Sequence, residues 1–564
     1  MSTSRRLFAA GWLAVLVGGL LAYWIQTSGG IRVHDVRFTG ANGKPMSGLL
    51  YVPPNATAKT PAPGILAVHG YINSRETQSG FAIEFARRGY VVLALDQTGH
   101  GYSAAPAFAD GFGGPAGLKY LRGLDIVDSN NIGLEGHSMG GGSILAAALA
   151  FPDGYKSLVL EGSATRTLFS PPGSATFPRN LAVVFSKYDE FSQMMWGVAR
   201  AADVGSSAKL QQLFGTSESV QPGQLHGSIE AGTARILFTP ATTHPGDHIS
   251  PTAIGDSIEW FQRTLEGGAP KDRDDQIWMW KELGTLIALV GGVLVLLGAF
   301  DWLLSLPALS VLRSPAVPAR ERRDARWWIA FALTGLVPVL TFYPFMYLGS
   351  VLLPASSALP QGITNQIVVW ALLNAAITLV LGVLFKSGQP RAPLRWGASI
   401  AIALWAVAIA YLSLLLADYF FKIDFRFWVV ALKLLSPDRV GIVLTYLVGF
   451  TAFFMVAFRA LTGFIAIKGE TAGRTYLSAI GALAGGFALF IIAQYAPLFA
   501  AGHLLVPTQA LNAIISIQFL PLMIILAIVC IFTWRRTNSY LPGALIAGLF
   551  VTWYIVAGTA THVA

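Results

Sequence analysis

The stretch "GLEGHSMGGGS", residues 133–143, places Ser138 between two glycines, Gly136 and Gly140. A serine in this pattern is typical of a nucleophile that stands on a sharp turn between a strand and a helix. Glycine accounts for 59 of the 564 residues, so five matching letters alone are weak support. The assignment depends on a strand before the turn, a helix after it, and an acid and a histidine further along the chain.

The sequence on each side of this turn predicts the required strand and helix. "NIGLEG", residues 131–136, predicts a strand, and "GGSILAAALAF", residues 141–151, predicts an alanine-rich helix. Short β-rich runs alternate with helical patterns through this half of the chain, which predicts an α/β fold with a mostly parallel, doubly wound sheet. The other expected strands are 31–39, 47–53, 64–70, 90–96, 157–162, 181–185 and 234–239, and further helices are expected near 75–88, 117–127 and from residue 250.

Three motifs connect residues 31–266 to a known family. They are "HGYINSRE" at 69–76, "DQTGHGYS" at 96–103 and "GHSMGG" at 136–141. In this order they resemble the oxyanion loop, the Asp-x-x-Gly-x-Gly-x-Ser stretch and the nucleophile elbow of the α/β-hydrolase superfamily, above all its dienelactone-hydrolase and prolyl-oligopeptidase-like esterases. The resemblance implies an α/β-hydrolase fold and a serine hydrolase.

Ser138 is therefore the expected nucleophile, and a structural helix-capping serine is the alternative. Its hydroxyl would stand at the N-terminal end of a helix, where backbone N–H groups and the macrodipole favour developing negative charge. We expect the backbone N–H groups of Met139 and Tyr71 to form the oxyanion hole.

A serine hydroxyl needs a base that is oriented by an acid, and in this fold the order is serine, acid, histidine. "LAVVFSKYDEF", residues 181–191, places Asp189 in a loop just beyond a strand. We expect Asp189 to be the acid; a helix N-cap is the alternative role, and Glu190 and Asp203 are weaker candidates.

The base is one of two histidines in "ARILFTPATTHPGDHIS", residues 234–250. His244 lies about four residues beyond the expected strand, which is the usual place in related folds, so it is the favoured base and His248 is the alternative. His69, His100 and His137 lie in motif loops and are expected to be structural, with His226 exposed. No histidine, cysteine and acid cluster has metal-ligand spacing, so we expect neither metal nor cofactor.

The composition indicates a membrane protein. Charged residues make up only 12% of the chain, hydrophobic residues make up 54%, and the mean hydropathy is +0.55. The apolar excess begins near residue 270, and before it the chain has the mixture of a soluble protein. The single cysteine, Cys530, excludes an intrachain disulfide framework.

Nine runs are long enough to cross a bilayer, which requires about 20 mostly apolar residues. The first, 7–25, is either a cleaved signal peptide or an uncleaved anchor. Tyr23 and Trp24 at its end favour an anchor. The others lie near 283–305, 327–352, 363–385, 397–417, 440–458, 476–495, 513–533 and 541–560. The expected domains are an anchor at 1–30, a hydrolase domain at 31–270 and a polytopic domain with about eight helices at 271–564.

Flanking charges predict the orientation. With the N-terminus inside, the cytoplasmic loops 306–326, 386–396, 459–475 and 534–540 carry many basic residues, among them Arg313, Arg320, Arg322, Arg323, Arg326, Lys386, Arg391, Arg395, Arg459, Lys468, Arg474, Arg535 and Arg536. The opposite loops 353–362 and 496–512 carry none. The positive-inside rule then places residues 26 to about 275 outside the cytoplasm of a bacterial-type inner membrane. It accounts for much of the net charge of +9 without nucleic acid.

One external loop, residues 418–439, mixes aromatic and charged side chains. We expect an amphipathic helix in the outer interface, or else a surface on which the soluble domain rests. We expect the membrane half, with this segment, to border the cleft and to present substrate from the bilayer; the alternative is that the segment only lies at the interface and the spans serve as an anchor. Apolar contact would come from Phe420, Phe421, Phe425, Phe427 and Trp428, and anionic head groups would meet Lys422 and Arg426.

The expected function is an integral-membrane serine hydrolase that cleaves carboxylic esters through an acyl-enzyme. The chain is too short between residues 162 and 181 for a large lid, so the cleft is open or is roofed by the membrane domain, which favours lipid-like substrates from the bilayer. Amide or peptide cleavage, acyl transfer to an envelope acceptor, and a transporter or receptor with a binding-only domain are the alternatives. The spans hold no acid or base at mid-membrane, which disfavours a proton-coupled transporter. The oligomeric state stays open.

Overall fold

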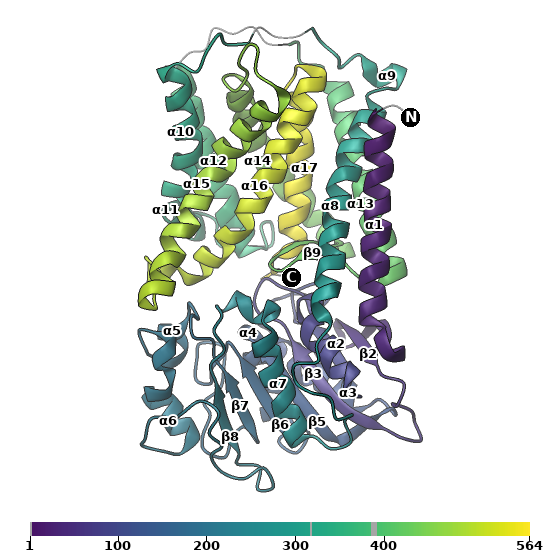
Figure 1. The fold of residues 1–564 in the computed structure, drawn as a ribbon, viewed down its shortest axis with the longest axis vertical. Coiled ribbons are helices and arrows are strands. Elements are labelled where there is room, and N and C mark those ends of the chain that lie inside the picture. The colour runs from purple at the N-terminus through teal and green to yellow at the C-terminus, as the bar shows by residue number, and fades with distance from the viewer. Residues whose placement is uncertain (1–2, 316–318, 385–391, 564) are drawn as a thin grey trace.

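The computed structural model describes residues 3–315, 319–384 and 392–563. Two parts stack along its long axis: a bundle of long helices and, at one end, an α/β domain (Figure 1). We call α1 with α8–α17 the helical domain, and β1 through α7 the α/β domain. Lys386 and Arg391, two of the basic residues assigned to a cytoplasmic loop, lie outside the described residues.

One eight-stranded sheet forms the centre of the α/β domain. Its order is β1-β2-β4-β3-β5-β6-β7-β8; β1 and β2 pair antiparallel, β2 pairs antiparallel with β4, and all other pairs are parallel. The mostly parallel sheet predicted from the sequence is confirmed. The strands are β1 (Arg32–Thr39), β2 (Pro45–Val52), β3 (Ala62–Val68), β4 (Val91–Asp96), β5 (Val127–His137), β6 (Ser157–Glu161), β7 (Leu181–Val184) and β8 (Arg235–Phe238).

Helices cover both faces of this sheet because the central parallel strands are apolar on both sides. One core contains apolar side chains of α3 (Gly114–Arg122) and α4 (Met139–Ala150), and the other contains those of α2 (Ser79–Arg87) and α7 (Pro251–Thr264). The helix expected at 117–127 ends earlier, at Arg122. Gly123 is a poor helix former, and Val127 already pairs with Ala62 in the sheet.

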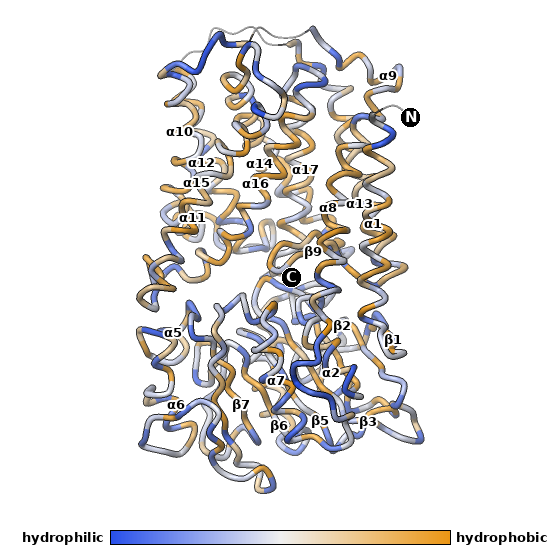
Figure 2. The backbone as a smooth tube through the Cα atoms, viewed as in Figure 1, coloured by the Kyte–Doolittle hydropathy of each residue, from blue (hydrophilic) through white to orange (hydrophobic). Residues whose placement is uncertain are grey.

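The helical domain contains eight helices that are long and apolar enough to cross a membrane, or nine if a bent pair counts as one span, among the described residues. Figure 2 shows the apolar character along these helices. They are α1 (Thr3–Gln26), α8 (Trp278–Leu303), α12 (Gly362–Leu384), α13 (Trp396–Phe421), α14 (Pro437–Thr462), α15 (Ala472–Ala501), α16 (Ala510–Thr537) and α17 (Leu541–Gly558), with the bent pair α10 (Ala325–Leu340) and α11 (Phe342–Leu352).

The run 327–352, expected as one continuous span, is this bent pair. Its two halves meet at 51°. Pro338 lies inside α10 and has no N–H to donate, so the helix weakens there and ends at Leu340. The carbonyl oxygen of Pro338 instead accepts a hydrogen bond from the indole of Trp370 on α12, at 2.9 Å.

The prediction of an amphipathic helix within 418–439 is wrong. After α13 ends at Phe421, the chain forms a short hairpin of β9 (Phe425–Phe427) and β10 (Val430–Leu432), which pair antiparallel. Five of the six residues in these two strands are buried, so the segment does not have the one exposed face of an interfacial amphipathic helix. The other expectation for this segment, a surface on which the soluble domain rests, describes what the structure has: the hairpin lies between the two domains (Figure 1).

Arg426 of this hairpin does not face lipid head groups, contrary to expectation. Its side chain is 2% exposed, forms an ion pair with Asp424 and donates to Thr77 of the α/β domain at 2.9 Å. Burial of a guanidinium is tolerated only with such partners. Phe425 is also buried, whereas Phe420 and Phe427 are exposed.

α1 packs along α8 at very short distance, because glycines remove the side chains between them. Gly284, Gly291 and Gly298 recur at every seventh position of α8. A Cβ atom at Gly291 would lie 2.7 Å from the backbone nitrogen of Val15, and one at Gly298 would lie 2.6 Å from the Cα atom of Phe8. Small residues at such spacing allow apolar helices to approach closely. The α/β domain is therefore joined at both ends to one tightly packed helix pair.

Candidate active site

Ser138 connects β5 to α4 with a strained backbone, φ 55° and ψ −119°. The glycines on either side make this turn possible. A Cβ atom at Gly136 would overlap the carbonyl oxygen of Gly140, and one at Gly140 would overlap the carbonyl oxygen of Val68 on the neighbouring strand. A non-glycine residue at this φ is costly and is retained where the surroundings enforce it. The turn presents Ser138, which is half-buried, at the carboxyl edge of the sheet.

Asp189 and His244 come from the loops after β7 and β8 and meet beside this turn. His244 Nδ1 lies 2.8 Å from Asp189 Oδ2, and the N–H of Phe191 donates to Asp189 Oδ1 at 2.7 Å. Gly162, with φ 49°, leaves room for the imidazole, since a Cβ atom there would lie 3.0 Å from His244 Nδ1. Among the described residues, Ser138 forms no side-chain hydrogen bond with His244. Catalytic hydrogen bonds are often long without substrate.

Burial sets the protonation of this pair. It lowers the pKa of the His244 imidazole to about 4, so the ring is neutral at pH 7 and can accept a proton. Burial also raises the pKa of the Asp189 carboxyl, while the hydrogen bond from the Phe191 N–H acts in the opposite direction.

His248 lies in a single turn of 3-10 helix (Pro245–Ile249) and does not reach Asp189. Neither of its ring nitrogens has a hydrogen-bond partner among the described residues. Its ring packs against that of His137, with centroids 4.1 Å apart. Of the two candidate bases, His244 contacts Asp189, whereas His248 packs against His137 and makes no contact with Asp189.

The two expected oxyanion donors lie on either side of Ser138. Met139 is the first residue of α4, and Tyr71 follows Gly70, whose Cβ atom would lie 3.0 Å from the Cβ atom of Ser138. Neither backbone N–H donates to another residue in the described part of the chain. Both are therefore available to an anion at this point.

The comparison with protein families concerns the segment that carries this geometry. Residues 63–224 match a family described as "alpha/beta hydrolase fold". The α/β domain has the α/β-hydrolase fold. The match spans β3 to the segment beyond α6 and contains Ser138 and Asp189, whereas His244 lies outside it.

Curated relatives of the hydrolase domain share a shorter segment. Uncharacterized proteins of Mycobacterium tuberculosis and Mycobacterium bovis are 33% identical over 105 residues, which is 17% of this chain. The chain spans only 28% of the length of these relatives.

Solved structures similar to the hydrolase domain include an esterase of Pyrococcus furiosus, with 17% identity over 43% of this chain and 96% of that one. A CIB-like hydrolase of Thermoplasma acidophilum has 18% identity over 42% of this chain and 100% of that one. Both superpose with a TM-score of 0.30. These values carry no information on the substrate of this protein.

Glu190, next to the candidate acid Asp189, makes contacts that sequence reasoning missed. Considered only as a weaker candidate acid, it instead accepts the backbone N–H of His244 at 2.8 Å and the hydroxyl of Tyr495 on α15 at 2.9 Å. Burial raises its pKa to about 8. No local pattern could reveal the second contact, because Tyr495 is 305 residues away in sequence. Asp203, the other weaker candidate, pairs with Arg200 at the surface.

Three loops of the hydrolase domain that hold candidate catalytic groups contact the helical domain. In the loop after β3, the hydroxyl of Tyr71 lies 2.8 Å from His562 Nε2. In the loop after β7, Glu190 contacts Tyr495. In the loop after β8, the carbonyl oxygen of Pro245 accepts the indole N–H of Trp428 at 2.6 Å. The helical domain therefore covers the edge of the sheet where Ser138 stands.

Proposed function

We propose that this protein is an integral-membrane serine hydrolase with Ser138 as nucleophile, His244 as base and Asp189 as orienting acid. The observation that carries the proposal is the 2.8 Å contact between Asp189 and His244 beside a strained serine turn. An acid that fixes the imidazole in one tautomer is what a serine nucleophile requires.

The chemistry follows from the positions of these groups. Neutral His244 takes the proton of the Ser138 hydroxyl as Oγ attacks the ester carbonyl carbon. The carbonyl oxygen becomes an anion, which the N–H groups of Tyr71 and Met139 stabilise. The imidazolium then protonates the departing alcohol and leaves an acyl-enzyme, and a water molecule activated by His244 hydrolyses it.

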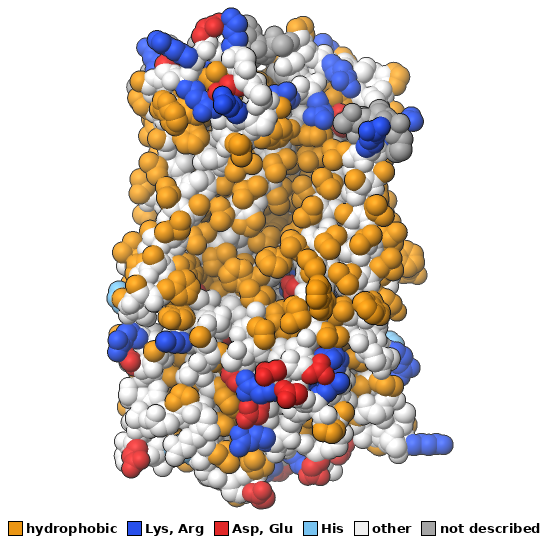
Figure 3. All heavy atoms as spheres, in the orientation of Figure 1, with side chains coloured by type: hydrophobic (Ala, Val, Ile, Leu, Met, Phe, Trp, Pro, Cys, Tyr) orange, Lys and Arg blue, Asp and Glu red, His pale blue; other side chains and the backbone are white. Residues whose placement is uncertain are grey.

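Carboxylic esters of lipid-like, membrane-proximal molecules are the proposed substrates. Support comes from the three contacts of the helical domain with the catalytic loops, which place apolar helices beside the site. The hydrolase domain would face away from the cytoplasm of a bacterial-type inner membrane. In Figure 3, Lys and Arg gather at the end of the helical domain opposite the hydrolase domain, in agreement with the positive-inside rule.

A fluorophosphonate probe tests the nucleophile. Wild-type protein should be labelled, and Ser138→Ala should lose labelling and lower kcat for a short-chain ester by roughly 10³ or more. Ser206→Ala, at an exposed position, is the matched control and should behave as wild type. Labelling of Ser138→Ala at the wild-type level would identify another nucleophile and refute the proposal.

A further inference from the structure

A pocket lies between the hydrolase domain and the helical domain, beside the loop after β3. Its empty volume is about 630 Å³, and this value includes space that is open to solvent. Ile72 and Asn73, which directly follow Tyr71, form one end. Helices α12, α16 and α17 and the β9–β10 hairpin supply the remaining walls.

The walls supplied by the helices are mainly apolar. Ile515, Phe519 and Leu522 line the pocket from one face of α16, because residues four and seven positions apart share a helix face. At 1.5 Å per residue these three positions span about 10 Å along the helix. Ile363 and Ile367, in the first two turns of α12, also line the pocket. These residues form an apolar strip of about 10 Å along the pocket wall, which offers contact to a hydrocarbon chain.

The hairpin side of the pocket carries a buried cation without a partner. Lys433 follows β10, lines the pocket and is 8% exposed. Its ammonium group forms no hydrogen bond or ion pair with any residue that the structure describes. A buried charge normally has a partner, because its desolvation is costly. Burial accordingly lowers the pKa of the Lys433 amine to about 8.

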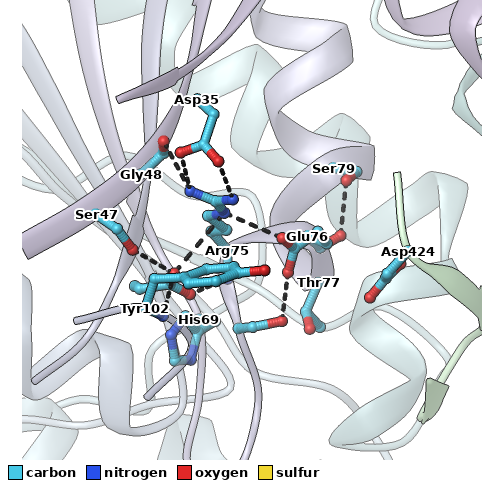
Figure 4. Close-up of polar contacts among 12 residues, drawn as sticks. Asp35, Ser47, Gly48, His69, Arg75, Glu76, Thr77, Ser79, Tyr102 and Asp424 are labelled. Carbon is cyan, nitrogen blue, oxygen red and sulfur yellow. Dashed lines mark hydrogen bonds and ion pairs between the residues drawn. The ribbon is translucent and has the colours of Figure 1, made fainter. Parts of the chain in front are cut away.

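The carboxylates near Lys433 are already engaged. Asp424 pairs with Arg426, and Glu76 lies 3.0 Å from Arg75 Nε. Figure 4 shows Arg75 between Asp35 and Glu76, with Asp424 on the far side of Glu76.

Asp96, the third carboxylate, is buried within the hydrolase domain. It accepts hydrogen bonds from the Ser47 hydroxyl and from the backbone N–H groups of Arg75 and Tyr102, at 2.5, 2.9 and 3.1 Å. These three carboxylates are bonded to other groups, and Asp418 lines a second, smaller pocket together with Lys433 without forming an ion pair with it. Lys433 also stands at the wall of the apolar pocket.

We propose that this pocket binds an anionic amphiphile, with one hydrocarbon chain along α12 and α16 and with its carboxylate or phosphate at Lys433 Nζ. The anionic group of such a ligand pairs with the Lys433 ammonium, and its hydrocarbon chain contacts the apolar walls of the pocket. Ile72 and Asn73 place the bound molecule next to Tyr71 and hence beside the catalytic loops. That the amphiphile is a substrate or a product rests on the proposed function, whereas the binding itself does not.

The test measures equilibrium binding of three radiolabelled probes to full-length protein in phosphatidylcholine nanodiscs. Dodecanoate and dodecyl phosphate carry an anionic group, and dodecanol has the same chain without charge. We expect wild-type protein to bind at least one anionic probe about tenfold or more tightly than dodecanol. Preference for dodecanoate points to a free fatty acid, and preference for dodecyl phosphate points to a lipid head group.

Lys433→Met keeps the apolar stem and removes the charge. It should reduce the affinity for the anionic probes to the level of dodecanol and leave dodecanol binding unchanged. Lys422→Met is the control, since Lys422 lies in the same connection, is half-exposed and does not line the pocket. Wild-type affinity of Lys433→Met for both anionic probes, in folded protein, would overturn the proposal.

A second variant tests the pocket. Gly558 lines the pocket at the end of α17, and a Cβ atom there would lie within 4 Å of no described residue. Gly558→Leu should weaken binding of all three probes about tenfold without loss of thermal stability, and unchanged binding would overturn the proposed location. Ser138→Ala should bind the probes as wild type does, so a failure of the proposed reaction is distinguishable from a failure of this site.

Discussion

At the scale of single residues, His244 and His248 lie four positions apart, yet only His244 shares a hydrogen bond with Asp189. His244→Ala should therefore lower kcat as much as Ser138→Ala, by roughly 10³ or more, because the three groups act as a unit. His248→Ala removes a ring that has no hydrogen-bond partner among the described residues, so it should have a milder effect. Steady-state kinetics on a soluble ester measures both, and the reverse ranking would transfer the role of base to His248.

Glu190 should make the stability of the protein depend on pH. Its pKa rises from an ordinary 4.5 to about 8 in the folded state because it is buried. Between these values the folded protein keeps a proton on Glu190 that the unfolded chain has released. The folded state binds more protons, so the free energy of unfolding falls as the pH rises through this window. Glu190→Gln should remove this contribution to the pH dependence of the free energy of unfolding.

Thermal melting between about pH 5 and pH 8.5 checks this expectation. The wild-type Tm should fall more steeply with pH than that of Glu190→Gln. Asp203→Asn is the matched control: Asp203 pairs with Arg200 at the surface, so its loss should leave the slope unchanged. Parallel profiles for wild type and Glu190→Gln would contradict the role given to Glu190.

The positions of Ser138, Asp189 and His244 could be predicted because each follows directly from a strand that local sequence reveals. The backbone of a parallel sheet brings such positions to one edge regardless of their distance along the chain. The bonds of Glu190 to the His244 N–H and to Tyr495 could not be predicted in this way. They depend on how two domains pack, and no periodic pattern records that packing.

At the scale of elements, the α1–α8 pair depends on glycine. Gly291→Leu would drive a side chain into the backbone of α1 at Val15 and should lower the free energy of unfolding by about 1–3 kcal/mol. Gly485→Leu on α15 is the control, since a Cβ atom there meets nothing within 4 Å. Apparent melting temperatures of the two purified variants test this. Equal values would show that α1 does not depend on this contact.

Helices that appear in the sequence as one long apolar run could be predicted. A segment that mixes aromatic, charged and apolar residues could not. The eight long apolar helices were each visible as a run of sufficient length. The segment 418–439 was mistaken for an amphipathic helix because it mixes aromatic and charged residues, whereas Phe425–Phe427 and Val430–Leu432 form strands. The partners that bury this hairpin, such as Thr77, lie in another domain, and burial against them decides its structure.

At the scale of the whole molecule, removal of the helical domain should change substrate preference. The cores of the α/β domain consist of residues 31–278, and Trp278 belongs to one of them, so a cut after residue 278 keeps both intact. This excised domain should still hydrolyse a short water-soluble ester. It should lose most activity on long-chain esters in mixed micelles, because the apolar helices beside the site are gone.

The comparison requires the ratio of kcat/KM for the two esters in full-length and excised protein. Ser138→Ala in both forms provides the background. If both forms have the same ratio, the helical domain serves only as an anchor, and the proposal that it contributes to the substrate site fails.

The glycine-rich contact of α1 with α8 has a consequence for the unfolded chain. If both helices remain paired in the membrane when the hydrolase domain unfolds, the released segment from Gln26 to Trp278 is still a closed loop of about 250 residues, with its ends held as a disulfide would hold them. Loop closure at this length lowers the conformational entropy of the unfolded chain by an amount worth about 5.5 kcal/mol at 25 °C. The helix pair thus stabilises a domain whose core it enters only with Trp278, the first residue of α8.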